Sequence, residues 1–131
     1  MANATAITVT ALTPDSAGVA QPTADVLDTG TAAVTLAAAV SGQSELVILE
    51  VKNTAGAANN LTVTVVAGDN PPAQRAGLGG LDTVIAQNAT AIIGPLESAR
   101  FIQDDGKLNV TFTPAAGTIG AAIRCYKVPR R

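Results

Sequence analysis

The sequence predicts an all-β protein: an antiparallel β-sandwich or jelly-roll of about eight or nine short strands, with an extended N-terminal arm. Threonine alternates with Val, Leu, Ile or Phe in several short runs, which is the two-residue period of a strand with one buried face. Clusters of Gly, Asn, Asp and Ser separate these runs and indicate turns. A chain of 131 residues, 47% of them apolar, suits one core, so residues 1–131 are predicted to form a single β-sandwich domain.

The N-terminal 30 residues contain one clear strand pattern. In AITVTAL, Ile7 and Val9 alternate with threonines. Residues 1–6 and 13–30 have few large apolar side chains, and the second of these ranges contains two prolines. We therefore expect both ranges to form an extended arm and loop that lie over the surface or over a neighbouring subunit.

Two segments in the first half of the chain depart from simple alternation. Residues 32–40 are rich in Ala, which favours helix, but Val34 and Thr35 favour strand, and we rank strand above helix there. Residues 45–52, ELVILEVK, form a near-continuous apolar run. Such a run is typical of a central strand that is packed on both faces, and we predict one here.

The second half of the chain has two further clear strands, two weaker candidates and a long closing strand. LTVTVV (61–66) and LNVTFT (108–113) alternate regularly, while TAIIGP (90–95) and SARFIQ (98–103) are weaker. Asp104, Asp105 and Gly106 predict a hairpin turn, because Gly readily adopts the positive φ that a tight turn requires. In IGAAIRCYKV, residues 119–128, a long closing strand is predicted with two distinct faces: Ile119, Ala121, Ile123 and Cys125 on one, Arg124 and Tyr126 on the other.

The charges are distributed unevenly although the net charge is only −2. Residues 1–51 hold five acidic and no basic side chains, whereas the chain from residue 124 onward is basic. We name its four cations as candidate inter-subunit charges that could also pair within one subunit: Arg124, Lys127, Arg130 and Arg131. Four cations on a net-acidic chain with few aromatic rings make a weak nucleic-acid footprint, so no nucleic-acid partner is expected.

No catalytic, cofactor-binding or metal-binding residues are predicted. The chain has no histidine, which is the commonest general base and metal ligand, and it shows no phosphate-binding glycine loop and no zinc-ligand spacing. The single cysteine, Cys125, lies among alternating apolar residues and is expected to be a buried, inert thiol. We therefore do not expect an enzyme, and with no run of about 20 apolar residues and no signal-peptide pattern we expect no membrane partner and synthesis in the cytosol.

The most distinctive segment is GDNPPAQRAGLGGL, residues 68–81. Paired prolines stiffen it, and Gly77, Gly79 and Gly80 permit tight bends. Long loops of this kind often carry function, although a simple crossover between two sheets would explain the segment equally well. The candidate partner-contact residues are Gly68, Asp69, Asn70, Pro71, Pro72 and Arg75, with Arg75 as an anchor for a carboxylate or a carbonyl group of a partner.

Two segments together resemble capsid decoration, or cement, proteins of tailed bacteriophages: VVAGDNPPAQRAGLGGL (65–81) and GPLESARFIQDDGKLNVTFTPAAGTIGAAIRCYKVP (94–129). The resemblance implies a β-sandwich or jelly-roll protein on the outer surface of the virion head. Such a protein is made in the host bacterial cytoplasm, often assembles as a homotrimer, and stabilises the shell of the major capsid protein. The first 60 residues match only in general character.

Two other functions remain open. Another virion part, such as a tail tube, head fibre or spike-base domain, would share the threonine-rich β character, but a fibre is expected to show repeats and the sequence shows none. A bacterial surface or carbohydrate-binding module is expected to have a signal peptide and exposed aromatic platforms for sugar rings. Tyr126 is the only candidate platform in this chain.

Overall fold

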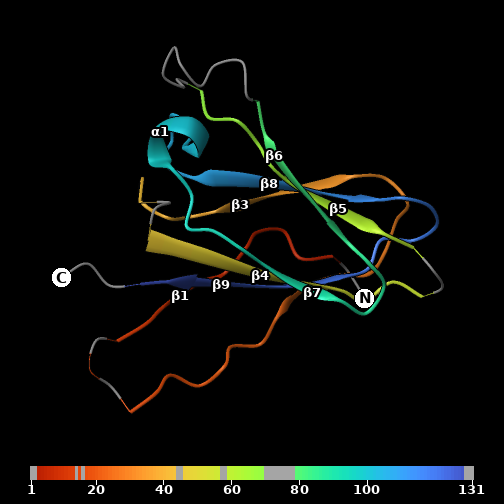
Figure 1. The fold of residues 1–131 in the computed structure, drawn as a ribbon, viewed down its shortest axis with the longest axis horizontal. Coiled ribbons are helices and arrows are strands. Elements are labelled where there is room, and N and C mark those ends of the chain that lie inside the picture. The colour runs from red at the N-terminus through yellow and green to blue at the C-terminus, as the bar shows by residue number, and fades with distance from the viewer. Residues whose placement is uncertain are drawn as a thin grey trace.

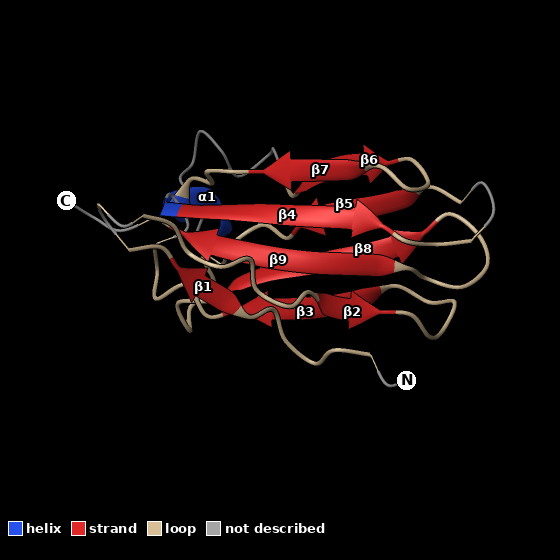
Figure 2. Cartoon of the chain, turned by 90° about the horizontal axis from the view of Figure 1, so that it is seen from below, coloured by secondary structure: helices blue, strands red, loops and turns tan. Residues whose placement is uncertain are grey.

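The computed structural model describes residues 3–13, 15, 17–43, 46–56, 59–69 and 79–128. Within them, nine strands form two sheets that pack face to face (Figure 1, Figure 2). Sheet A contains, in spatial order, β3 (Val34–Ala38), β8 (Leu108–Pro114), β5 (Leu61–Val65) and β6 (Leu81–Ile85). Sheet B contains β1 (Val9–Ala11), β9 (Ala121–Lys127), β4 (Val47–Asn53) and β7 (Thr90–Ile93), and β2 (Asp25–Leu27) also pairs with β9. The predicted β-sandwich is confirmed.

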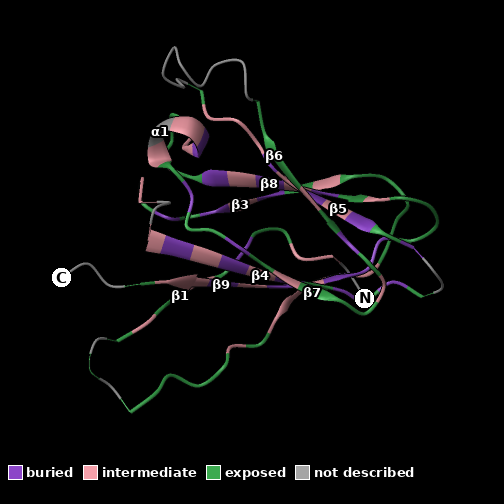
Figure 3. Ribbon diagram, viewed as in Figure 1, coloured by how far each residue is buried: buried purple, intermediate pink, exposed green. Residues whose placement is uncertain are grey.

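The core lies between the two sheets and follows the predicted alternation. In β5 and β8 every second side chain is buried, and Phe112 at 0% exposure is the largest of the fully buried residues. The threonines between them lie on the outer face of sheet A, where Thr35 Oγ1 is 2.7 Å from Thr111 Oγ1 and Thr64 Oγ1 donates to Asp82 Oδ1 at 2.7 Å. Figure 3 shows the buried and outward positions alternating along the strands.

Several predicted strands are confirmed in place. Residues 34–38 are the strand β3, so strand and not helix is the conformation in the Ala-rich segment. The weaker TAIIGP candidate contains β7. The closing strand β9 buries Ala121, Ile123 and Cys125, whereas Arg124 and Tyr126 lie on its other face and are half-exposed.

The strand β4 is central in sheet B, as predicted, but only one of its faces is packed. Val47, Leu49 and Val51 are fully buried, while Glu50 is half-exposed and Lys52 is exposed. The prediction of burial on both faces is therefore wrong. A two-layer sandwich leaves the outer face of each sheet toward solvent, and the apolar run is continued there by the half-buried Ile48 opposite Tyr126 of β9.

The strand predicted for SARFIQ is wrong, because its first four residues form the short helix α1 (Ser98–Phe101). The backbone N–H groups of Arg100 and Phe101 both donate to the Glu97 carbonyl at 3.2 Å, which turns Phe101 into the core. Only Ile102 retains strand pairing, in a single bridge to Leu108. The predicted turn itself is confirmed: Gly106 has a φ of 79°, and its N–H donates to the Gln103 carbonyl at 2.9 Å.

Two strands were not predicted. The edge strand β6 follows the glycine-rich loop and has exposed Leu81 and Val84, so it lacks a clear one-face pattern. The strand β2 lies inside the predicted 13–30 loop, which is a correction to that assignment, and its Leu27 is fully buried. Three residues are too few for periodicity to reveal a strand.

The N-terminal segment joins both sheets. Ile7 is 3% exposed, and its N–H donates to the Ala37 carbonyl of β3 at 3.0 Å, whereas β1 runs parallel to the last residues of β9. The 12–24 loop follows, and its described residues (12, 13, 15 and 17–24) are largely exposed and stand off the outer face of sheet B before the chain returns in β2 (Figure 1, Figure 3). The segment preceding that loop is thus part of the sandwich.

Candidate functional site

The candidate contact loop begins and ends beside α1 at one end of the sandwich (Figure 1). Its two stems are held by the helix and by the turn that follows it. We call this group of residues the loop clamp; it consists of Gly68 and Asp69 on the first stem, Gly79 and Gly80 on the second, and Arg100, Gln103 and Asp104 beneath them.

The first stem is held by three hydrogen bonds. The Gly68 N–H donates to the Arg100 carbonyl at 2.7 Å, and Gln103 Nε2 donates to the Ala67 carbonyl at 2.9 Å. The third bond is charge-assisted, because the Asp104 backbone N–H donates to the carboxylate Oδ2 of Asp69 at 2.7 Å. These bonds fix the direction in which the chain leaves β5.

Gly68 allows this approach because it has no side chain. A Cβ at this position would lie 2.4 Å from the carbonyl oxygen of Ile102 and 3.0 Å from the Ile102 nitrogen. Both neighbours are backbone atoms, so they cannot move aside as the end of a flexible side chain could. The glycine is required by packing here and not by a left-handed turn.

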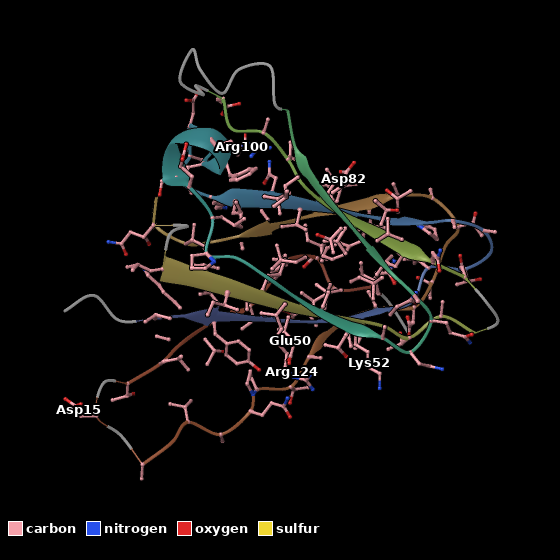
Figure 4. The ribbon with its side chains drawn as sticks, in the orientation of Figure 1. Asp15, Glu50, Lys52, Asp82, Arg100 and Arg124 are labelled. Carbon is pink, nitrogen blue, oxygen red and sulfur yellow. The ribbon has the colours of Figure 1, made fainter. Side chains whose placement is uncertain are left out.

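Arg100 holds the second stem. Its Nη2 lies 3.4 Å from the Gly80 carbonyl oxygen and 3.5 Å from that of Gly79, and its guanidinium carbon is 4.7 Å from the centre of the Phe101 ring. Phe101 is 3% exposed, so the ring is a fixed support in the core for the cation. Figure 4 shows Arg100 on α1, near the base of the loop.

The structure thus accounts for part of the predicted contact loop. Gly68 and Asp69 are in the loop clamp, whereas Asn70, Pro71, Pro72 and Arg75 lie outside the described residues. Sequence reasoning missed Arg100, Gln103 and Asp104 as partners of this loop. The local signal in the sequence was an arginine directly before Phe101. The number of residues between position 100 and positions 79 and 80 does not indicate that they are in contact.

The basic residues near the end of the chain make contacts within their own subunit. Arg124 Nη1 lies 3.8 Å from Glu50 Oε1, and Arg124 Nε donates to the Pro22 carbonyl at 2.9 Å (Figure 4). Lys127 Nζ is 3.5 Å from the Val40 carbonyl oxygen. The acidic front half and the basic end therefore meet at Glu50 and Arg124 of one chain, and a role between subunits stays a prediction; Arg130 and Arg131 lie outside the described residues.

Cys125 is the buried thiol that the sequence predicted, with 0% exposure. Burial, followed by the nearby negative charge of Asp25, raises the pKa of the Cys125 thiol from its ordinary value of 9.0 to about 12. At neutral pH the group is therefore protonated and a poor nucleophile.

Because of this raised pKa, the free energy of unfolding should decrease as the pH rises into the alkaline range. The unfolded chain releases the thiol proton near pH 9, before the folded chain does near pH 12, so the contribution of Cys125 is intact below pH 9 and is lost as pH rises. The expected loss is about 1.4 kcal/mol per pH unit in that window. Urea unfolding at pH 9, 10 and 11 should show a steeper decline for the wild type than for Cys125→Ala, and equal slopes would contradict the assignment. All other side chains are the same in both proteins, so the difference between the two slopes reports Cys125.

Over the described ranges, no enclosed pocket is present, and no three His, Cys, Asp or Glu side chains lie together in a group that could hold a metal ion. The same part of the chain has no helix of the length and apolarity needed to cross a membrane. No family model, curated protein or solved structure matches this chain.

Proposed function

We propose that this protein is a structural component of a tailed-phage virion that binds the outer surface of the head and stabilises the shell of the major capsid protein. The observation that carries the proposal is the loop clamp. The two segments that resemble decoration proteins, residues 65–81 and 94–129, are separate in sequence, yet Gly68, Asp69, Arg100 and Asp104 join them directly. The resemblance therefore falls on one spatial unit.

The loop clamp suits a binding role on physical grounds. Binding through a loop costs conformational entropy, and that cost is smaller when the ends of the loop are already held. Asp69 and Arg100 hold one end of the loop each.

On a shell with many identical sites, contacts that are individually modest can also give a large total stabilisation. A module that binds the assembled shell and not its separated subunits stabilises the shell by mass action, and repeated identical sites add to this through multivalency. Self-association as a homotrimer would match threefold positions on a head. On this proposal the protein needs no catalytic group.

Binding to heads tests the proposal directly. Expanded heads assembled without this protein, from the phage that encodes it, are sedimented with increasing amounts of purified protein. We expect saturable binding to a fixed number of sites and a higher temperature of head disruption. Folded protein that stays in the supernatant at all concentrations would overturn the proposal.

A matched pair of variants locates the contact. Arg75→Ala removes the cation of the candidate loop and should weaken binding to heads about tenfold, which is about 1.4 kcal/mol. Lys52→Ala removes an exposed cation from the outer face of sheet B, away from the loop clamp in Figure 4, and should leave binding unchanged. Equal losses in both variants would indicate a nonspecific charge effect instead of a loop contact.

The native mass in solution tests the trimer separately. Three chains of 13.0 kDa give about 39 kDa. A species of this mass at micromolar concentration is expected if the trimer forms before attachment. A strict monomer would remove the trimer from the proposal but not attachment to the head.

A further inference from the structure

We propose that residues 3–11 are an exchangeable strand, which a second copy of this chain can supply to β9 and β3 in place of the chain's own segment. Such an exchange would join two subunits whether or not the protein binds a capsid.

The contacts of this segment lie across the 12–24 loop. The Ala4 N–H donates to the Val26 carbonyl at 2.9 Å, the Ile7 N–H donates to the Ala37 carbonyl at 3.0 Å, and Val9–Ala11 pairs in register with residues 125–127. These partners all follow the loop in sequence. A segment from another copy could therefore make the same bonds in the same geometry.

The receiving surface belongs to the rest of the sandwich. The edge of β9 is shared between two short strands, β1 along residues 125–127 and β2 along residues 121–123 (Figure 2). Asp25 marks the junction, because its carboxylate accepts the Thr8 backbone N–H at 2.6 Å and the Thr8 hydroxyl at 3.1 Å. An incoming strand would meet an open edge of β9, the edge of β3 and a fixed carboxylate acceptor.

The attachment of the segment is short. β1 has three residues, and its pairing with β9 is parallel. Ile7 is the fully buried anchor, whereas Thr8 and Ala11 are exposed. Release uncovers Ile7 together with Ala4 and Val9, which pack against the core, and breaks the hydrogen bonds that residues 3–11 make, including three between Asn3 and residues 28 and 29. This is still less than unfolding of the sandwich exposes.

The 12–24 loop is much longer than the distance between the end of β1 and the start of β2 requires. β1 ends beside Lys127 and β2 begins beside Ile123, four positions apart on β9, which is about 13 Å. The 13 residues from 12 to 24 can span up to about 43 Å when extended. Figure 1 shows the loop reaching away from the sheet, and Val19 on it is 41% exposed.

Exchange is governed by local concentration. A segment tethered by a flexible loop acts at an effective concentration in the millimolar range, so copies held together at similar density can compete for the same site. The bonds are identical whether the segment pairs with its own chain or with a second copy. The length of the loop therefore determines which of the two forms is favoured.

Cross-linking distinguishes the two forms. In a Cys125→Ala background, Thr10→Cys with Tyr126→Cys places thiols on paired residues of β1 and β9, and Thr62→Cys with Thr113→Cys does so on β5 and β8. Both variants are unfolded, refolded at about 1 mM or about 1 µM, diluted, and treated with a short bis-maleimide. The second pair lies outside the exchanging segment and reports collisions between chains.

We expect multi-chain products from the Thr10 and Tyr126 pair after refolding at the high concentration, and single-chain products from the control pair in every sample. Deleting residues 13–23 leaves two loop residues, which reach about 11 Å at most and cannot span the distance of about 13 Å from the end of β1 to the start of β2. Multi-chain products should then predominate even at the low concentration. Single-chain products alone from the full-length loop at the high concentration would overturn the proposal, whatever the deletion variant does. Attachment to heads is measured separately, so a failure here leaves the proposed function untouched.

Discussion

Replacing Asn53 with Ala is expected to lower the free energy of unfolding by about 3–5 kcal/mol, the largest effect of any substitution considered for this protein. Asn53 is 0% exposed, at the end of β4. Its Nδ2 donates to the Asn59 carbonyl at 2.7 Å and to the Ile85 carbonyl at 2.9 Å, and its Oδ1 accepts the Ala55 N–H at 3.0 Å. Truncation leaves three buried backbone groups without this partner.

The position of Asn53 explains why the loss should be large. β4 belongs to sheet B, whereas Ile85 ends β6 of sheet A, so one side chain links the two layers and the loop that follows β4. Each buried polar group that loses its partner costs about 1–3 kcal/mol. Part of this cost is avoided where water enters the space, which is why the expected total is below the sum of three full penalties.

Asn109→Ala is the matched control for this prediction. Asn109 is also an asparagine in a strand, but it is half-exposed on the outer face of sheet A, and its change should stay within about 0.5 kcal/mol. Urea unfolding at pH 7 measures both variants. If the two substitutions lower the free energy of unfolding by the same amount, the hydrogen bonds of Asn53 do not link the two sheets in the way described.

The fold was predictable where side chains alternate. Val63, Val110 and Ile123 lie in strands whose side chains alternate with a period of two. The sequence alone therefore indicates each strand and which of its faces is buried. β6 escaped because an edge strand exposes Val84 and Leu81. β2 escaped because three residues carry no readable period. Local pattern therefore predicts central strands better than edges.

The candidate site was predictable only in part, for a different reason. The loop at 68–81 stands out by its own prolines and glycines, which are local features. Its partners Arg100 and Asp104 are identified by proximity in three dimensions, and the interval along the chain gives no information about that proximity. The structural role of Asn53 could likewise not be predicted, since the sequence does not distinguish a buried asparagine from one in a turn.

Replacing Gly68 with Ala should destabilise the protein by about 3 kcal/mol and weaken its attachment to heads at the same time. The new Cβ would lie 2.4 Å from the Ile102 carbonyl oxygen, so the first stem of the loop must move away from the 102–107 turn. That movement separates the Gly68 N–H from the Arg100 carbonyl and Asp69 from the Asp104 N–H. The wild-type direction of the loop is then lost even in molecules that remain folded.

Gly56→Ala separates this effect from the general consequences of replacing a glycine. Among the described residues, apart from its chain neighbours, no heavy atom lies within 4 Å of a Cβ built at Gly56, so the stability of this variant should stay within about 0.5 kcal/mol of the wild type. Urea unfolding and sedimentation with heads, both below the unfolding transition of each variant, give the two readouts. A Gly68→Ala protein that binds heads as the wild type does would show that the loop clamp does not position the contact loop. A variant as stable as Gly56→Ala would instead show that the backbone at residue 102 can shift at little cost.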